Sequence, residues 1–168
     1  MLRFAAALLG VLMSLGAQTP SELPAFTVIG ASTRTTNALE MSGDNGKIGP
    51  LWNQFVKGAD KNIPGVIDQD TTYAVYSNYE NDANGAYDFT LGRSVRPEQK
   101  ALTGMKSIHI PAARYLVFTA AGNSPDAIKA AWGNVYDYFA RHTERHRAFT
   151  IDFEQYGKSG IKLYIGVL

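Results

Sequence analysis

The chain has 168 residues, of which 45% are hydrophobic and 11% aromatic, and this suits one domain with a substantial apolar core. Its 16 Lys and Arg residues stand against 15 Asp and Glu residues, a net charge of +1. This balance argues against nucleic acid as a partner, because proteins that bind it usually carry a basic patch. The absence of cysteine excludes disulfides, thiol catalysis and lipidation of a cysteine.

Residues 1–17 have the layout of a secretory signal peptide. A short basic start is followed by apolar or small residues from Phe4 to Leu15, and Gly16 and Ala17 offer small side chains for cleavage. The apolar run is short for a bilayer-spanning helix. We therefore expect cleavage after Ala17, export to the periplasm or the medium, and no stable membrane insertion afterwards. An uncleaved anchor or a core helix is the alternative.

The first half of the remaining chain reads as a linker, a strand, a polar loop, a helix and two strands. These elements are expected at residues 18–23, 25–34, 35–46, 47–57, 71–79 and 86–95. The helix is predicted because apolar residues recur at i, i+3, i+4, i+7 and i+8, which places them on one helical face. They are Ile48, Leu51, Trp52, Phe55 and Val56. Gly58 is well placed to end this helix.

The second half repeats this order after a polar connection. Residues 106–111 are a short extended piece, and strands are expected at 112–120, 148–156 and 160–167. A helix begins at Pro125, which suits the first helical position, and Ser124 is a favourable N-cap. The basic stretch 142–147 is expected to be an exposed helix end or loop.

Each half thus contains a helix with one Trp, followed by a hairpin. We predict an α+β fold in which two β-α-β-β repeats, about 24–95 and 105–168, form one domain (24–168) with an antiparallel sheet and two main helices. The seam between two such repeats is a natural place for a ligand cleft. Two unrelated helix–hairpin units in one α+β domain are the alternative.

Several candidate sites fail on spacing or surroundings. The glycine-rich segment 43–49 lacks the Walker spacing, so it is interpreted as a helix-entry loop. His142 and His146 are four residues apart, but a metal site needs a third ligand, and neighbouring arginines would repel a cation. No nucleophile elbow or catalytic triad is visible. The sequence therefore predicts neither a metal nor a cofactor.

Two carboxylates, Asp152 and Glu154, lie within an aromatic strand of the second half. A carboxylate beside aromatic rings is costly to bury unless it is paired, but it becomes useful when the ligand is cationic, since the rings add cation–π attraction. Strict strand alternation instead turns both acids to water, opposite Ile151 and Phe153. From the residues alone both interpretations stay open.

Six stretches in order carry a family resemblance. They are PAFTVIG (24–30), IGPLWNQF (48–55), YAVYSNYE (73–80), IPAARYLVF (110–118), WGNVY (132–136) and DFEQYG (152–157). The set, which spans about 24–168, resembles the GyrI-like, or bacterial transcription activator effector-binding, superfamily. It is most similar to the stand-alone integron cassette-type effector-binding proteins. Many members carry a fused DNA-binding domain, and no helix-turn-helix pattern is visible here.

The resemblance implies the tandem β-α-β-β (GyrI-like/SHS2-type) fold and an aromatic groove at the repeat seam that binds hydrophobic, often cationic, small molecules. It places the groove acid of the Asp-Phe-Glu-x-Tyr motif at Glu154, and a bulge or a sheet with two buried faces would reconcile this with strand alternation. The expected aromatic wall is Trp52, Tyr76, Tyr87, Trp132, Tyr136 and, less directly, Tyr115.

The resulting hypothesis is a stand-alone, exported binding protein for hydrophobic or cationic small molecules. The first alternative is a small-molecule hydrolase in which Glu154 acts as general base with Tyr136 or Tyr76. The second is a protein-interaction domain that presses the groove onto a partner.

Overall fold

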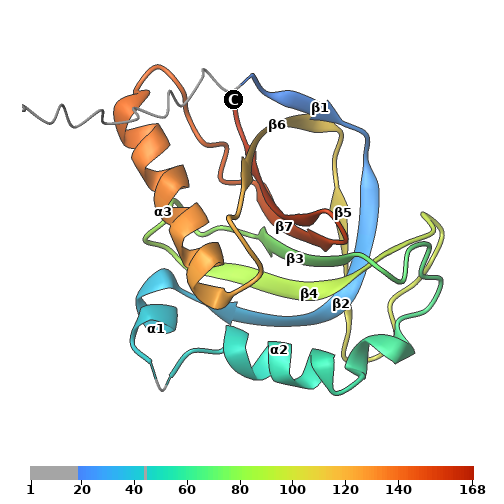
Figure 1. The fold of residues 1–168 in the computed structure, drawn as a ribbon. Coiled ribbons are helices and arrows are strands. Elements are labelled where there is room, and N and C mark those ends of the chain that lie inside the picture. The colour runs from blue at the N-terminus through green and yellow to red at the C-terminus, as the bar shows by residue number, and fades with distance from the viewer. Residues whose placement is uncertain (1–18, 44) are drawn as a thin grey trace, which may run out of the picture.

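The centre of the structure, a computed structural model that describes residues 19–43 and 45–168, is an antiparallel sheet with the strand order β1-β6-β8-β7-β3-β4-β2-β5 (Figure 1). The strands are β1 (Ser21–Leu23), β2 (Phe26–Thr35), β3 (Thr72–Ser77), β4 (Tyr87–Val95), β5 (Lys106–Ile110), β6 (Ala113–Thr119), β7 (Ile151–Gly157) and β8 (Gly160–Gly166). The predicted α+β class and antiparallel sheet are confirmed. The predicted signal peptide lies outside the described residues.

The sheet curls strongly, and two short connections explain why. β5 lies at one edge, yet only Pro111 and Ala112 separate it from β6, which is second from the opposite edge. The link from β1 to β2 spans the same gap in reverse. Strands are about 4.8 Å apart, so two residues cannot cross a flat sheet of this width. The two edges therefore approach each other, and the sheet encloses an apolar interior.

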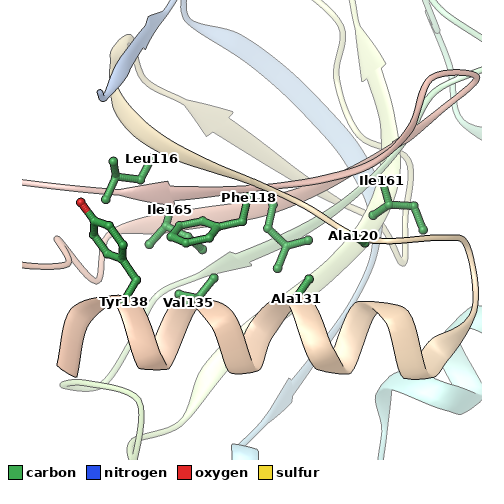
Figure 2. Packing of buried hydrophobic residues seen from close by; sticks show 9 residues of the cluster. Leu116, Phe118, Ala120, Ala131, Val135, Tyr138, Ile161 and Ile165 are labelled. Atoms are coloured by element: carbon green, nitrogen blue, oxygen red, sulfur yellow. The ribbon is translucent and has the colours of Figure 1, made fainter. Parts of the chain in front are cut away.

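Both faces of the curled sheet are covered. The inner face carries a cluster formed by Val28, Val75, Ile110, Tyr115 and Phe153. The outer face carries two helices, α2 (Ile48–Val56) on β2 and β4, and α3 (Pro125–Arg141) on β6 and β8. Figure 2 shows how Ala131, Val135 and Tyr138 of α3 point toward Leu116, Phe118 and Ile165 of the strands. The middle of the outer face, formed by β3 and β7, lies between the two helices.

Both main helices lie close to the predicted ranges, and the order β-α-β-β recurs as β2-α2-β3-β4 and β6-α3-β7-β8. The predicted N-cap is also present, since the Ser124 hydroxyl accepts a hydrogen bond from the Ala127 amide at 3.2 Å. Within residues 19–43 and 45–168, no helix combines the length and apolarity needed to cross a membrane.

Three short elements were not predicted. The expected linker 18–23 contains β1, which pairs with β6, and the expected loop 35–46 contains α1 (Asn37–Met41). A 3₁₀ turn, η1 (Ala59–Asn62), follows α2. The prediction was wrong here because elements of three to five residues are too short to show a hydrophobic period.

Candidate functional site

A cleft of about 1010 Å³ lies on the outer face of the sheet, between α2 and α3. Its floor is formed by β3, β4 and β7, and α1 and the segment before β7 complete its walls. We call this space the central cleft. Six of the seven predicted site residues line it: Trp52, Tyr76, Tyr87, Trp132, Tyr136 and Glu154. The elements of the two halves therefore meet at one hollow, as the seam argument predicted.

Glu154 lies on the floor of the central cleft and is held by three neutral donors. Its Oε1 accepts hydrogen bonds from the Tyr76 hydroxyl at 2.8 Å and from the Trp132 indole N–H at 2.6 Å. Its Oε2 accepts one from the Tyr156 hydroxyl at 2.5 Å. The side chains of β3, α3 and β7 thus fix one carboxylate in one orientation.

In the part of the chain that the structure describes, this carboxylate has no ion-pair partner. Glu154 is 2% exposed, and among the described residues no Lys, Arg or His forms an ion pair with it. Burial raises the pKa of Glu154, while the hydrogen bonds from Tyr156, Trp132 and Tyr76 act in the opposite direction. Burial and the nearby carboxylate raise the pKa of Tyr76 and of Tyr156, so both phenols remain neutral donors. Among the described residues, the site therefore holds a buried, hydrogen-bonded acid that no cationic side chain pairs with.

The direction of Glu154 follows from strand alternation together with the covering of both faces. Phe153 points into the curled sheet and packs against Tyr115 and Tyr164 at ring-centroid distances of 5.3 and 4.5 Å. Its neighbours Asp152 and Glu154 must then point to the outer face. On that face the side chains of β3, α3 and the segment before β7 lie over the two acids, so alternation holds and both acids are buried. Of the two reconciling explanations, the sheet with two buried faces is the one observed.

Asp152 differs from Glu154 because it has an internal countercharge. The Asp152 side chain is 0% exposed and accepts from Arg147 Nη2 at 2.6 Å, from the Tyr79 hydroxyl at 2.7 Å and from the Gly166 amide at 2.8 Å. Burial lowers the pKa of Arg147, but the Asp152 carboxylate and Tyr79 reverse this and raise the pKa overall. One acid of the motif is therefore neutralised, and the other is not.

Aromatic rings surround the Glu154 carboxylate. The Tyr76 ring lies 5.1 Å from the Trp132 ring and 5.5 Å from the Tyr87 ring, measured between centroids. On the α2 side, Trp52 packs edge-on against Tyr156 at 4.8 Å. The cleft thus has ring surfaces that favour apolar or cationic ligands, and it also has one fixed acid, Glu154.

The family model of integron-associated effector-binding proteins matches residues 21–167. The chain belongs to this family. The integron cassette protein VCH_CASS2 of Vibrio cholerae has 33% identity and a TM-score of 0.76, over 90% of this chain and 95% of that chain. YobU of Bacillus subtilis is 33% identical over 132 residues, which are 77% of this chain and 80% of YobU.

Two further relatives match at lower identity. The transcriptional regulator BrlR of Pseudomonas aeruginosa is 27% identical over 80% of this chain, but the match spans only 46% of BrlR. The structure of SAV2435 bound to tetraphenylphosphonium has a TM-score of 0.66 at 14% identity, over 91% of this chain and 94% of that chain, and shows the shared fold. Family and cleft together identify this effector-binding family member as a small-molecule-binding protein.

Tyr115 is the predicted site residue that this family member does not bring to the cleft. It is 1% exposed and packs in the inner cluster beside Phe153. Its neighbour on β6, Leu116, points outward into the core beneath α3, so alternation turns Tyr115 to the inner face. Its predicted role as a wall of the ligand groove was therefore wrong, and its role is packing.

The hydrolase alternative named Glu154 with Tyr136 or Tyr76. Tyr136 is 44% exposed, and its hydroxyl accepts a hydrogen bond from Asn37 Nδ2 at 3.3 Å. Within the described part of the chain, no hydrogen bond connects Tyr136 to Glu154. Tyr76 does contact Glu154, but as one of three donors that already occupy the carboxylate. In the described residues, no group of three or more His, Asp or Glu could hold a metal ion.

Four residues of the site were missed. Tyr156 is two positions from Glu154 on the same strand face, a signal that period-two reading could have used. Tyr79 and Arg147 line the cleft and are held there by hydrogen bonds that they donate to Asp152. Asn37 accepts from the Tyr87 hydroxyl at 3.1 Å and belongs to α1, which was not predicted.

Proposed function

We propose that the protein binds hydrophobic organic cations in the central cleft, and that Glu154 selects for positive charge. The observation that carries this proposal is the carboxylate of Glu154, which is buried and fixed by Tyr76, Trp132 and Tyr156 and which, among residues 19–43 and 45–168, forms no ion pair. Burial of an ionised acid is unfavourable unless a positive charge compensates it. A cationic ligand supplies that charge.

The rings of the cleft supply the remaining attraction. Cation–π contact with a desolvated aromatic face contributes about 0.5–2 kcal/mol per ring, and ring burial adds a hydrophobic term. Trp52, Tyr76, Tyr87 and Trp132 all line the cleft. SAV2435, a protein with this fold, was solved bound to tetraphenylphosphonium, a bulky aromatic cation. This neighbour supports the ligand class that the acid and the rings suggest.

Tetraphenylphosphonium affinity should depend on pH through Glu154. Because burial raises the pKa of Glu154 above the ordinary value of 4.5, a proton competes with the cation as the pH falls through the raised pKa. Calorimetric titration between about pH 8 and about pH 4 should therefore show weakening affinity for the cation, while the affinity of neutral triphenylmethanol stays constant.

The unliganded protein should show the opposite trend in stability. A raised carboxyl pKa contributes stability that is fully present below the ordinary pKa and is lost as the pH rises through the folded-state value.

Absence of tetraphenylphosphonium binding at every pH would contradict the proposed ligand class. Recovery of a converted compound after long incubation would favour the hydrolase.

We also propose that the protein is exported. The support is the pattern of residues 1–17, namely the basic start, the apolar run and the small residues Gly16 and Ala17. Expression of the full chain in a Gram-negative host, followed by fractionation and N-terminal sequencing, should give a periplasmic product that begins at Gln18. A cytoplasmic product that retains Met1 would contradict export without affecting the proposed ligand.

A further inference from the structure

We propose that Arg147 forms a second polar subsite of the central cleft, which accepts a neutral hydrogen-bond acceptor, such as a carbonyl oxygen, on the ligand that Glu154 binds. This inference rests on the proposed function, because it adds a second recognition element to the same site. It specifies the ligand class as an aromatic cation that also carries a carbonyl group.

The first support is the incomplete hydrogen bonding of a buried guanidinium. The Arg147 side chain is 7% exposed and lines the cleft. A guanidinium has five N–H donors in a fixed plane. Within residues 19–43 and 45–168, the one hydrogen bond found for this group runs from Nη2 to Asp152 Oδ2 at 2.6 Å, and Nε has no partner. Nε has no accessible surface, so the donors left for a ligand are the terminal N–H groups that the bond to Asp152 does not use, and an acceptor in the cleft would satisfy them.

The second support is position, since one indole links Arg147 to Glu154. The Trp132 N–H donates to Glu154 Oε1 at 2.6 Å, and the Arg147 guanidinium carbon lies 5.7 Å from the Trp132 ring centroid. Phe149 supports the guanidinium at 4.4 Å from its own ring centroid. The acid therefore lies at the N–H edge of the indole and the guanidinium over its ring, so a ligand beside Trp132 is close to both.

The third support is the local charge, which decides the chemistry of the acceptor. Asp152 neutralises Arg147, and Tyr79 and Gly166 complete the hydrogen bonds of that carboxylate. Glu154 adds an uncompensated negative charge nearby. A second anionic group on the ligand would be repelled by Glu154, whereas a neutral oxygen can accept from the guanidinium without this penalty. The subsite therefore favours a carbonyl over a carboxylate.

Two phosphonium ions test this proposal because they match in charge and size. (4-Acetylbenzyl)triphenylphosphonium carries a carbonyl oxygen where (4-ethylbenzyl)triphenylphosphonium carries hydrogens. The ethyl compound is the more hydrophobic, so burial alone favours it. We expect the wild-type protein to bind the acetyl compound about five-fold more tightly, because hydrogen bonds to charged donors are among the stronger ones. Calorimetry of both ions gives the preference directly.

Arg147→Lys should abolish this preference, since it keeps a positive charge for Asp152 but loses the planar fork. Arg145→Lys, the same change two residues away and outside the cleft lining, should retain it. Glu154→Gln should weaken both ions and leave their ratio unchanged. If Arg147→Lys does not fold, the double variant Arg147→Met/Asp152→Asn removes both charges together and should also lose the preference.

The outcomes separate this inference from the proposed function. Equal binding of the two ions to the wild type, or a preference that survives in the Arg147 variants, would overturn the subsite and leave cation binding by Glu154 intact. A wild-type protein that binds neither ion would overturn both proposals. Loss of the preference in Arg145→Lys as well would show a general effect of the segment and would also overturn the subsite.

Discussion

Replacing Asp152 with asparagine should lower the free energy of unfolding by about 3–5 kcal/mol, the range expected when one partner of a buried ion pair is removed. The Asp152 carboxylate is fully buried and receives donors from Arg147, Tyr79 and the Gly166 amide. Asparagine has the same shape, but its amide nitrogen cannot accept a hydrogen bond, and the Arg147 charge would remain buried without compensation. Urea denaturation at neutral pH measures the change.

Two comparisons make this result specific to the buried pair. Asp137→Asn removes an exposed acid that pairs with Arg141 across one helical turn, and it should have little effect. The double variant Arg147→Met/Asp152→Asn should recover much of the lost stability, because neither member of this pair is then left as a buried charge without the other. If Asp152→Asn is as stable as Asp137→Asn, the Arg147–Asp152 pair does not stabilise the fold, and this account of the segment before β7 is wrong.

The elements whose evidence is local were predictable from the sequence. The apolar stripe from Ile48 to Val56 and the Ser124–Pro125 start signal identify α2 and α3 because helical periodicity and capping need only neighbouring residues. Alternation likewise gives the correct sharing of faces on β7, where Asp152 and Glu154 point one way and Phe153 points the other.

Whether a strand face is exposed to solvent depends on elements that are distant in the sequence. The residues of β7 alone therefore could not show whether Glu154 is buried. Glu154 is buried because β7 pairs with β3, opposite Ala74, in the middle of a sheet whose other strands carry the two helices. Arg147 shows the same effect. It stands in a basic segment that was predicted to be exposed, but Asp152 and the Phe149 ring hold it in the wall of the cleft. Only the fold brings these partners together.

Replacing Glu154 with glutamine should weaken tetraphenylphosphonium binding by about 1–3 kcal/mol, or roughly 5- to 150-fold in Kd, and should spare neutral triphenylmethanol. Glutamine keeps the length of the side chain and one acceptor oxygen for Tyr76 and Trp132, but it has no charge to attract a cation. The ring walls, which bind both ligands, stay in place. Calorimetric titration of each ligand measures the two effects separately.

Glu40 provides the matched control, because it is a second glutamate that lines the central cleft. Its oxygens accept from the Lys47 and Ile48 amides at the start of α2, where the helix dipole already compensates a negative charge. Glu40→Gln should therefore reduce cation affinity less than Glu154→Gln. Equal losses in the two variants would mean that the cleft attracts cations through its total charge. Equal losses for the cation and the neutral ligand in Glu154→Gln would mean that this acid shapes the cleft and does not select charge.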